Sequence, residues 1–325
     1  MAASIPSVWQ RRPWASLSGR VKAGLAIVGL VILVAIIGPS IAPYDPSAIS
    51  GAILQPPSWS HLLGTTQTGQ DVLSQMLVGT RTSVVIGLVA GALATFIGVV
   101  IGMTAGFLGG TTDDLLSLLT NVFIVIPALP LLIMITAYIK NAGDLVLALV
   151  IAFIGWAFTG RIIRAQTLSL RRRDFILAAR ASGEGTPRLL FSEILPNVGA
   201  IIASGFLFSV ILAILTQASL AFLGLGNPSE WSWGTILYWA QNNEALSVGA
   251  WWWFVPPGIA IALLGAALSM INFGIDQLIN PRLRSRTRSR QAEDGQQDEA
   301  ERLLSPTGDD FVSTTGMAEP QGETT

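Results

Sequence analysis

Few residues of this chain could carry acid–base, metal or nucleophile chemistry. It has no Cys, which excludes disulfides, thiolate metal sites and cysteine nucleophiles. Its single histidine, His61, argues against a histidine-based metal site or a catalytic triad. A phosphate-binding Gly-Lys-Ser/Thr loop is also excluded, because the only lysines, Lys22 and Lys140, follow Val and Ile. The chain is therefore not a P-loop ATPase by itself.

Basic residues are concentrated in residues 161–197, the one long polar stretch between strongly apolar ones. It carries seven of the nineteen Lys and Arg residues. Arginine can fix a topology, or it can bind an acidic or polar partner. We expect residues 161–197 to be a docking element for a second protein, because topology alone would not require the helical pattern that follows.

That pattern is a pair of helices joined by glycines. Residues 167–182 contain no Gly or Pro and are rich in Leu, Ala and Arg, which predicts a helix. We expect Gly183 and Gly185 to end this helix. A second, short helix should then start with Thr186 as its N-cap and Pro187 in the first helical position, and end at Pro196; all three residues are of the types expected there.

The elements that must position this segment are membrane spans. The chain has 325 residues, of which 51% are hydrophobic and 12% charged, with a mean hydropathy of +0.59. Charged residues make up about a quarter of soluble proteins. Six apolar runs are expected to cross the membrane: residues 23–42, 82–108, 115–139, 145–160, 198–225 and 251–275.

Details of three runs support this interpretation. We favour an anchored first span over a cleaved signal peptide, because the run exceeds a typical h-region and no A-x-A-like site follows it. The second span carries small residues whose spacing predicts close helix packing, although Gly is also simply common in membrane helices: Gly87, Gly91, Gly98, Gly102 and Gly106. Three consecutive tryptophans opening the last run, at 251–253, suit an interfacial belt.

The distribution of basic residues predicts the orientation. With both termini in the cytoplasm, seventeen of nineteen Lys and Arg residues lie on the cytoplasmic side, and only Arg81 and Lys140 lie outside. The opposite orientation would invert this ratio, so the positive-inside rule favours cytoplasmic termini. We expect the basic run at 282–290 to meet anionic lipid. Residues 291–325 hold nine acids and one base, which predicts a disordered spacer.

Deep polar residues of the spans are neutral. Proton- or ion-coupled carriers usually hold ionisable groups in mid-membrane. Here the deep residues are Asn121, Thr136, Gln217 and Asn272. Hydrogen bonding between helices is the simpler role for them, and Asn121, Gln217 and Asn272 are our candidates for a translocation pathway. The chain has a possible translocation pathway but no phosphate-binding loop and no ionisable group in mid-membrane. This suggests that a separate polypeptide supplies the energy and docks on residues 161–197.

Several motifs resemble one family. LAARASG at 177–183, followed by ILPN at 194–197, resembles the EAA loop of bacterial ABC-importer permeases. Further stretches are similar to C-type permeases of the peptide-importer (peptide/nickel) branch, and the resemblance covers roughly residues 20–285: IAPYDP at 41–46, HLLGTTQTGQDVLSQMLVGTRTS at 61–83, GFLGGTTDDLL from residue 106, ASLAFLGLG at 218–226, SWG at 232–234 and NPRLR at 280–284. The HLLGT context suggests that His61 has a structural role in an ordered extracellular loop.

The resemblance implies an all-α membrane protein with the six-helix type I ABC-importer architecture. This chain would be a non-catalytic subunit without a cofactor of its own. ATP and Mg²⁺ would be bound by two ABC ATPase subunits, and a second permease and an external solute-binding protein would complete an importer of di- or oligopeptides or related solutes in the cytoplasmic (inner) membrane. The ATPase-coupling residues it implies are Phe175, Leu177, Ala178, Ala179, Arg180, Gly183, Glu184 and Arg188.

The chain departs from the family pattern at a few positions. Leu177 stands where the family has the glutamate of E-A-A, so charged contacts would fall to Arg180, Glu184 and Arg188. Thr66 and Gln70 replace charged residues of the loop motif, and Gln217 stands where many relatives have an acid; Gln217 is on the apolar run at 198–225.

The expected organisation has three parts. Residues 1–78 form the cytoplasmic N-terminus, the first span and an extracellular loop. Residues 79–284 form a five-helix permease core with the coupling loop 161–197, and residues 285–325 form the disordered acidic cytoplasmic tail. The alternative function is a stand-alone secondary transporter or channel. The neutral deep residues argue against a secondary transporter, and the docking helices argue against a channel.

Overall fold

A computed structural model describes residues 18–139 and 143–279, with side chains through residue 275. The expected acidic tail lies outside the described residues. Within them the fold is all-α, and the only β-type pairing is an isolated bridge between Thr65 and Asp71. The elements are α1 (Gly19–Ile41), α2 (Val72–Leu108), α3 (Gly110–Val125), α4 (Ala128–Tyr138), α5 (Asp144–Leu170), α6 (Asp174–Ala181), α7 (Thr186–Arg188), the π-helical turn η2 (Leu189–Ile194), α8 (Leu195–Phe222), α9 (Trp233–Asn242) and α10 (Trp251–Ile279).

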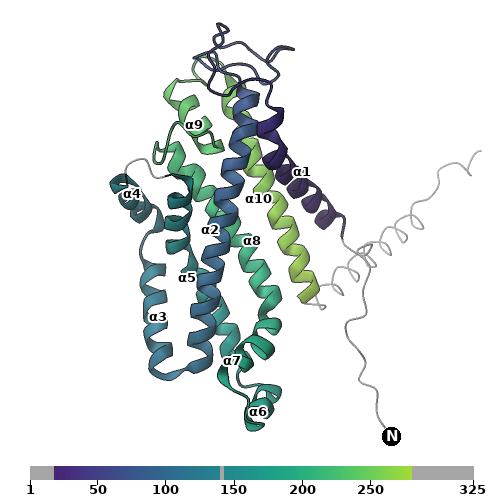
Figure 1. Cartoon of the computed structure of the whole chain (residues 1–325), viewed down its shortest axis with the longest axis vertical. Coiled ribbons are helices and arrows are strands. Elements are labelled where there is room, and N and C mark those ends of the chain that lie inside the picture. The colour runs from purple at the N-terminus through teal and green to yellow at the C-terminus, as the bar shows by residue number, and fades with distance from the viewer. Residues whose placement is uncertain (1–17, 140–142, 280–325) are drawn as a thin grey trace, which may run out of the picture. The chain divides into compact units, whose positions relative to one another are not determined.

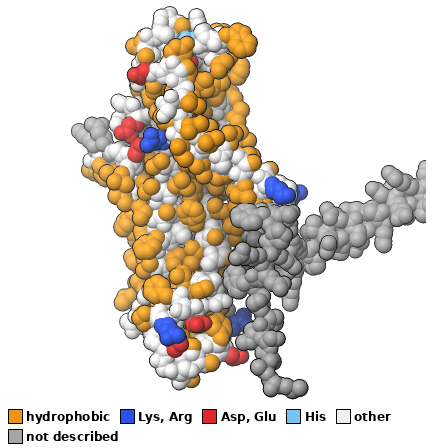
Figure 2. Space-filling view, turned by 45° about the vertical axis from the view of Figure 1, so that its right-hand side comes forward, with side chains coloured by type: hydrophobic (Ala, Val, Ile, Leu, Met, Phe, Trp, Pro, Cys, Tyr) orange, Lys and Arg blue, Asp and Glu red, His pale blue; other side chains and the backbone are white. Residues whose placement is uncertain are grey.

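The spans match the apolar runs. Five helical segments are long and apolar enough to cross a membrane, and α3 with α4 forms a sixth candidate that is bent by 85°. Figure 1 shows the long helices side by side, with α6 and α7 at one end of the bundle and α9 at the other. On the face in Figure 2, hydrophobic side chains cover the belt between groups of charged ones. The predicted six-span all-α architecture is confirmed.

Prolines break the third span. Ile126, at the end of α3, is extended (φ −67°, ψ 126°), because a following proline disfavours the helical region. Pro127 then precedes α4. Pro130 lies in the first turn of α4, where its missing N–H costs no hydrogen bond. The span therefore continues in a new direction.

Three predicted boundaries were wrong. α2 begins at Val72, ten residues before the expected Thr82, because the Asp71 carboxylate accepts a hydrogen bond from the Ser74 N–H (2.8 Å) and caps an earlier start. α5 continues to Leu170, ten residues past the expected Gly160. α3 starts at Gly110, five residues before the expected residue 115, so only Gly109 separates it from α2.

The segment between the apolar runs at 198–225 and 251–275 contains α9. Ser232 and Thr235 form a capping box at its start: the Ser232 hydroxyl accepts the Thr235 N–H (3.1 Å), and the Thr235 hydroxyl accepts the Ser232 N–H (2.7 Å). Trp233 is buried and its indole N–H donates to the Thr80 hydroxyl of α2 (3.1 Å). These contacts fix α9 against α2.

The α9 end of the bundle also holds His61. Its Nδ1 lies 2.9 Å from the carboxylate of Asp71, the residue that caps α2. The Tyr44 ring stacks on the imidazole with centroids 4.9 Å apart. Trp252 of α10 donates from its indole N–H to the Thr65 carbonyl (3.2 Å). These contacts support the structural role expected for His61.

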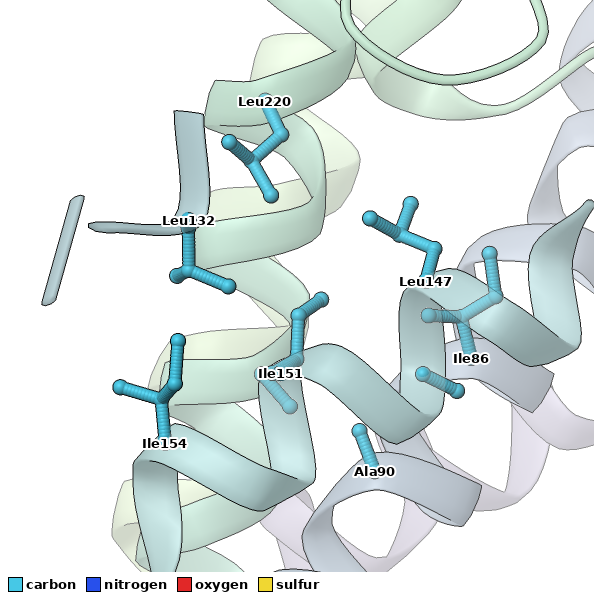
Figure 3. Packing of buried hydrophobic residues seen from close by; sticks show 9 residues of the cluster. Ile86, Ala90, Leu132, Leu147, Ile151, Ile154 and Leu220 are labelled. Carbon is cyan, nitrogen blue, oxygen red and sulfur yellow. The ribbon is translucent and has the colours of Figure 1, made fainter. Parts of the chain in front are cut away.

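The core is built on α2 and α5. Figure 3 shows one buried cluster in which α2 contributes Ile86 and Ala90, α5 contributes Leu147, Ile151 and Ile154, and α4 and α8 contribute Leu132 and Leu220. The glycines of α2 make this approach possible. A methyl group at Gly98 would lie 2.9 Å from the Gly160 nitrogen, and one at Gly91 would lie 2.9 Å from the Val210 nitrogen. The predicted close packing is confirmed.

We therefore expect Gly102→Ala to destabilise the bundle. A methyl group at Gly102 would lie 2.5 Å from the Gly160 carbonyl oxygen, so α2 and α5 must move apart. Overpacking of this kind costs about 1–3 kcal/mol. A lower thermal unfolding midpoint in detergent would show it. Gly265→Ala is the matched control, because a methyl group there meets nothing within 4 Å; an equal effect of both changes would contradict the packing argument.

Candidate functional site

Parts of residues 161–197 belong to the long helices themselves. Because α5 runs to Leu170 and α8 starts at Leu195, only residues 171–194 lie between the two long helices. The single helix predicted for 167–182 was wrong, since a turn at 171–173 separates α5 from α6. Arg171 explains the break: its Nη1 donates to the Gly106 carbonyl (3.1 Å), near the end of α2, where a cation is favourable.

The glycine break after α6 is confirmed. Gly183 has a φ of +85°, in the left-handed region that favours glycine. Its N–H donates to the Arg180 carbonyl (3.1 Å), and the Glu184 N–H donates to the Ala179 carbonyl (3.2 Å). The chain thereby reverses within two residues.

The second helix differs from the prediction at both ends. Thr186 is the first residue of α7 rather than its N-cap, since Gly185 is the extended residue that precedes it (φ −75°, ψ 155°). Pro196 does not end the helix; it lies in the first turn of α8. The π-helical turn η2 explains this, because the Leu195 N–H bonds the Leu190 carbonyl, five residues back. In this wider turn the backbone hydrogen bonds run five residues back instead of four. The change comes just before Pro196, which has no N–H to donate, so the helix continues through the proline.

Ile176 anchors α6 to the spans. It is fully buried, in a cluster with Met103 and Phe107 of α2, Ile163 of α5, and Leu189, Ile194 and Val198. The sequence interpretation missed this residue. The sequence held a signal for it, because the apolar residues Ile176 and Ala179 are three residues apart and so share one helix face. Both side chains pack into this cluster. A movement of α6 therefore has a direct path to α2, α5 and α8.

Other side chains of the segment are exposed. The exposed fractions are 42% for Phe175, 50% for Leu177 and 68% for Phe191, and Ala178 and Arg180 are exposed as well. Exposed large apolar side chains in a segment that also carries arginines suit a protein interface. This apolar and cationic surface, Phe175, Leu177, Arg180 and Phe191, is called the docking face below.

Three contacts of basic side chains lie in or near the docking face. The Arg180 guanidinium lies 5.2 Å from the centroid of the Phe107 ring. Arg188 pairs with Glu184 at 3.2 Å. Behind them, Arg164 of α5 makes a two-pronged pair with Asp113 of α3, at 2.5 Å from Nε and 2.8 Å from Nη2. Of the eight expected coupling residues, the structure places all in or beside α6 and α7.

The three pathway candidates do not meet in one place. Gln217 of α8 is buried and its Nε2 donates to the Ser232 hydroxyl (3.1 Å). Asn272 of α10 accepts a hydrogen bond from Ser204 of α8. Asn121 has an exposed side chain on α3. Gln217 and Asn272 thus make the bonds between elements that the simpler interpretation predicts, and Asn121 makes none that the structure records.

Fold and site together define a class: a polytopic helical membrane protein with a short helix at one end of its bundle that exposes apolar and basic side chains. Residues 98–285 match the family model described as binding-protein-dependent transport system inner membrane component. Residues 21–57 match the model for the N-terminal TM domain of oligopeptide transport permease C. The chain belongs to the family of inner membrane components of binding-protein-dependent transport systems.

Curated relatives agree. The chain is 35% identical to the oligopeptide transport system permease protein OppC of Bacillus subtilis over 265 residues, 80% of this chain and 85% of the relative. It is 33% identical to OppC of Mycobacterium tuberculosis over 81% of this chain and 90% of the relative. It is 33% identical to the di/tripeptide permease DppC of Pseudomonas aeruginosa, covering 81% and 88%. The resemblance to C-type ABC-importer permeases is confirmed.

Proposed function

We propose that this chain forms half of the membrane pathway of an ATP-driven importer of di- or oligopeptides or related small solutes. The observation that carries the proposal is the docking face: α6 presents exposed Phe175, Leu177 and Arg180 around its buried anchor Ile176, and exposed Phe191 follows in η2. The names of the similar OppC and DppC proteins support a peptide-like substrate.

The proposed assembly contains four further proteins. A second permease completes the pathway, two ABC ATPase subunits bind ATP and Mg²⁺ and carry out hydrolysis, and an external solute-binding protein delivers the solute. Among the described residues no group of three His, Cys, Asp or Glu side chains could hold a metal. The proposal gives this chain no catalytic role and assigns ATP and Mg²⁺ to the two ATPase subunits.

We also propose the cytoplasmic (inner) membrane as the location, with both termini in the cytoplasm. The seven basic residues of 161–197 support this orientation, because basic loops are found mostly on the cytoplasmic side. The same orientation places the docking face in the compartment that holds ATP. Up to residue 276, Figure 1 shows the start of α1 and the later turns of α10 directed toward the end of the bundle that holds α6. Six successive crossings require such an arrangement.

A stand-alone secondary transporter or channel is the second candidate. The docking face argues against it, because a protein working alone has no use for exposed aromatic side chains at one end of its bundle.

The test is reconstitution with the proteins encoded beside this chain. We expect a second permease, ATPases and a binding protein to co-purify, and ATP hydrolysis in lipid vesicles to rise when binding protein and a peptide are both present. A peptide library then identifies the substrate. Uptake by this chain alone, without ATP, would contradict the proposal.

A further inference from the structure

A small polar cavity lies at the end of the bundle opposite the docking face. It sits between the first turn of α5, the end of α8 and the segment that precedes α9. Its volume is about 10 Å³, which is close to the space of one water molecule. The polar residues around it are Thr82, Asp144, Gln217, Asn227, Glu230, Ser232 and Thr235.

Two acids face each other in this cavity. Asp144 and Glu230 both line the cavity, close enough for their carboxyl groups to interact, and both are partly buried. No Lys or Arg among the described residues forms an ion pair with either of them. Like charges at contact distance in a partly buried site repel strongly unless a positive charge or a proton lies between them.

Two oxygens of the cavity lack a partner. Glu230 accepts a hydrogen bond from the Asn227 side chain on Oε1 (3.1 Å), but its Oε2 is buried and accepts none from an N–H or hydroxyl group. Gln217 is 2% exposed; its Nε2 donates to Ser232, while its Oε1 is buried without a donor. A buried acceptor without a donor costs about 1–3 kcal/mol. A bound cation would satisfy both oxygens at once.

We propose that this cavity is a binding site for a single hard divalent cation, Ca²⁺ in the first place. Asp144, Glu230 and the amide oxygen of Gln217 supply oxygen ligands, which Ca²⁺ prefers, and the two carboxylates balance its charge. Water or backbone carbonyls complete the shell, since no third acid of the described residues converges there. The ion fastens the start of α5 to the end of α8 and to the segment before α9.

The test uses the full chain in lipid nanodiscs, with Ca²⁺ as the probe. We expect millimolar Ca²⁺ to raise the thermal unfolding midpoint of the wild type, followed by tryptophan fluorescence. The double change Asp144→Asn and Glu230→Gln should abolish this increase. Without Ca²⁺, the double variant should be at least as stable as the wild type, because the repulsion between the carboxylates is gone.

Further variants separate the site from general charge effects. Gln217→Leu should weaken Ca²⁺ binding about tenfold and Gln217→Glu should tighten it about tenfold, since ligand number and charge set the affinity. Glu244→Gln is the control, because Glu244 is an exposed acid of the segment after α9. An unchanged Ca²⁺ response in the double variant, or no response in the wild type, would overturn the proposal. Neither result depends on what the importer transports.

Discussion

The triple change Phe175→Asp, Leu177→Asp and Phe191→Asp is expected to abolish co-purification of the ATPase subunits. These side chains are 42%, 50% and 68% exposed, so a large part of each is accessible to a partner. Buried apolar anchors of an interface contribute about 2 kcal/mol or more each. We therefore expect at least a 100-fold weaker association with the ATPases, which corresponds to roughly 2.7 kcal/mol. Pull-down from membranes that contain all the subunits measures it.

The control is a matched change at the other end of the bundle. Leu246 and Val248 are 60% and 55% exposed. Changing both to Asp should leave ATPase association intact, since they lie in the segment between α9 and α10. The triple variant should insert and unfold like the wild type. If it retains the ATPases, the docking face has been assigned to the wrong surface.

Ile176→Ala is expected to separate docking from transport. The change removes a fully buried side chain and costs about 2–5 kcal/mol of packing beneath α6. The exposed docking face remains, so the ATPases should still co-purify. Closure of the ATPases would then move a loosened α6 without moving α2, α5 and α8, and we expect peptide uptake to fall at least about tenfold.

Ile176→Val provides the matched control. It retains the branched side chain and costs about 0.5–1.5 kcal/mol, so most uptake should persist. The measurement compares ATPase co-purification with peptide uptake in the same vesicles. Normal uptake by Ile176→Ala, or loss of the ATPases from it, would contradict a role in transmission.

The spans could be predicted because membrane solvation leaves a strong signal in composition. Long uncharged runs and clustered arginines are local features, and the Gly183 break follows from the single backbone conformation that glycine favours. The glycines of α2 were likewise informative, since small residues at regular spacing have few other uses in a buried helix.

Other features depended on contacts between distant residues. The end of α5 is set by Arg171 reaching the Gly106 carbonyl, sixty-five residues away. The burial of Ile176 requires the side chains of α2 and α8 around it. Pro196 usually stops a helix, and only a π-helical turn in the preceding residues lets it continue. The pairing of Asp144 with Glu230 brings together residues that the sequence keeps far apart.

Because of that π-helical turn, residues 186–222 form one continuous rod. At 1.5 Å per residue, its 37 residues reach about 55 Å. A rod pushed at one tip and pivoting near its middle moves its far tip the opposite way by a similar amount. A displacement of the helix at Thr186 would thus displace Gln217 sideways through the rigid helix itself, without successive changes in side-chain packing between them. Pro196, which the sequence predicted to end a helix, is therefore part of the helix that would transmit this movement.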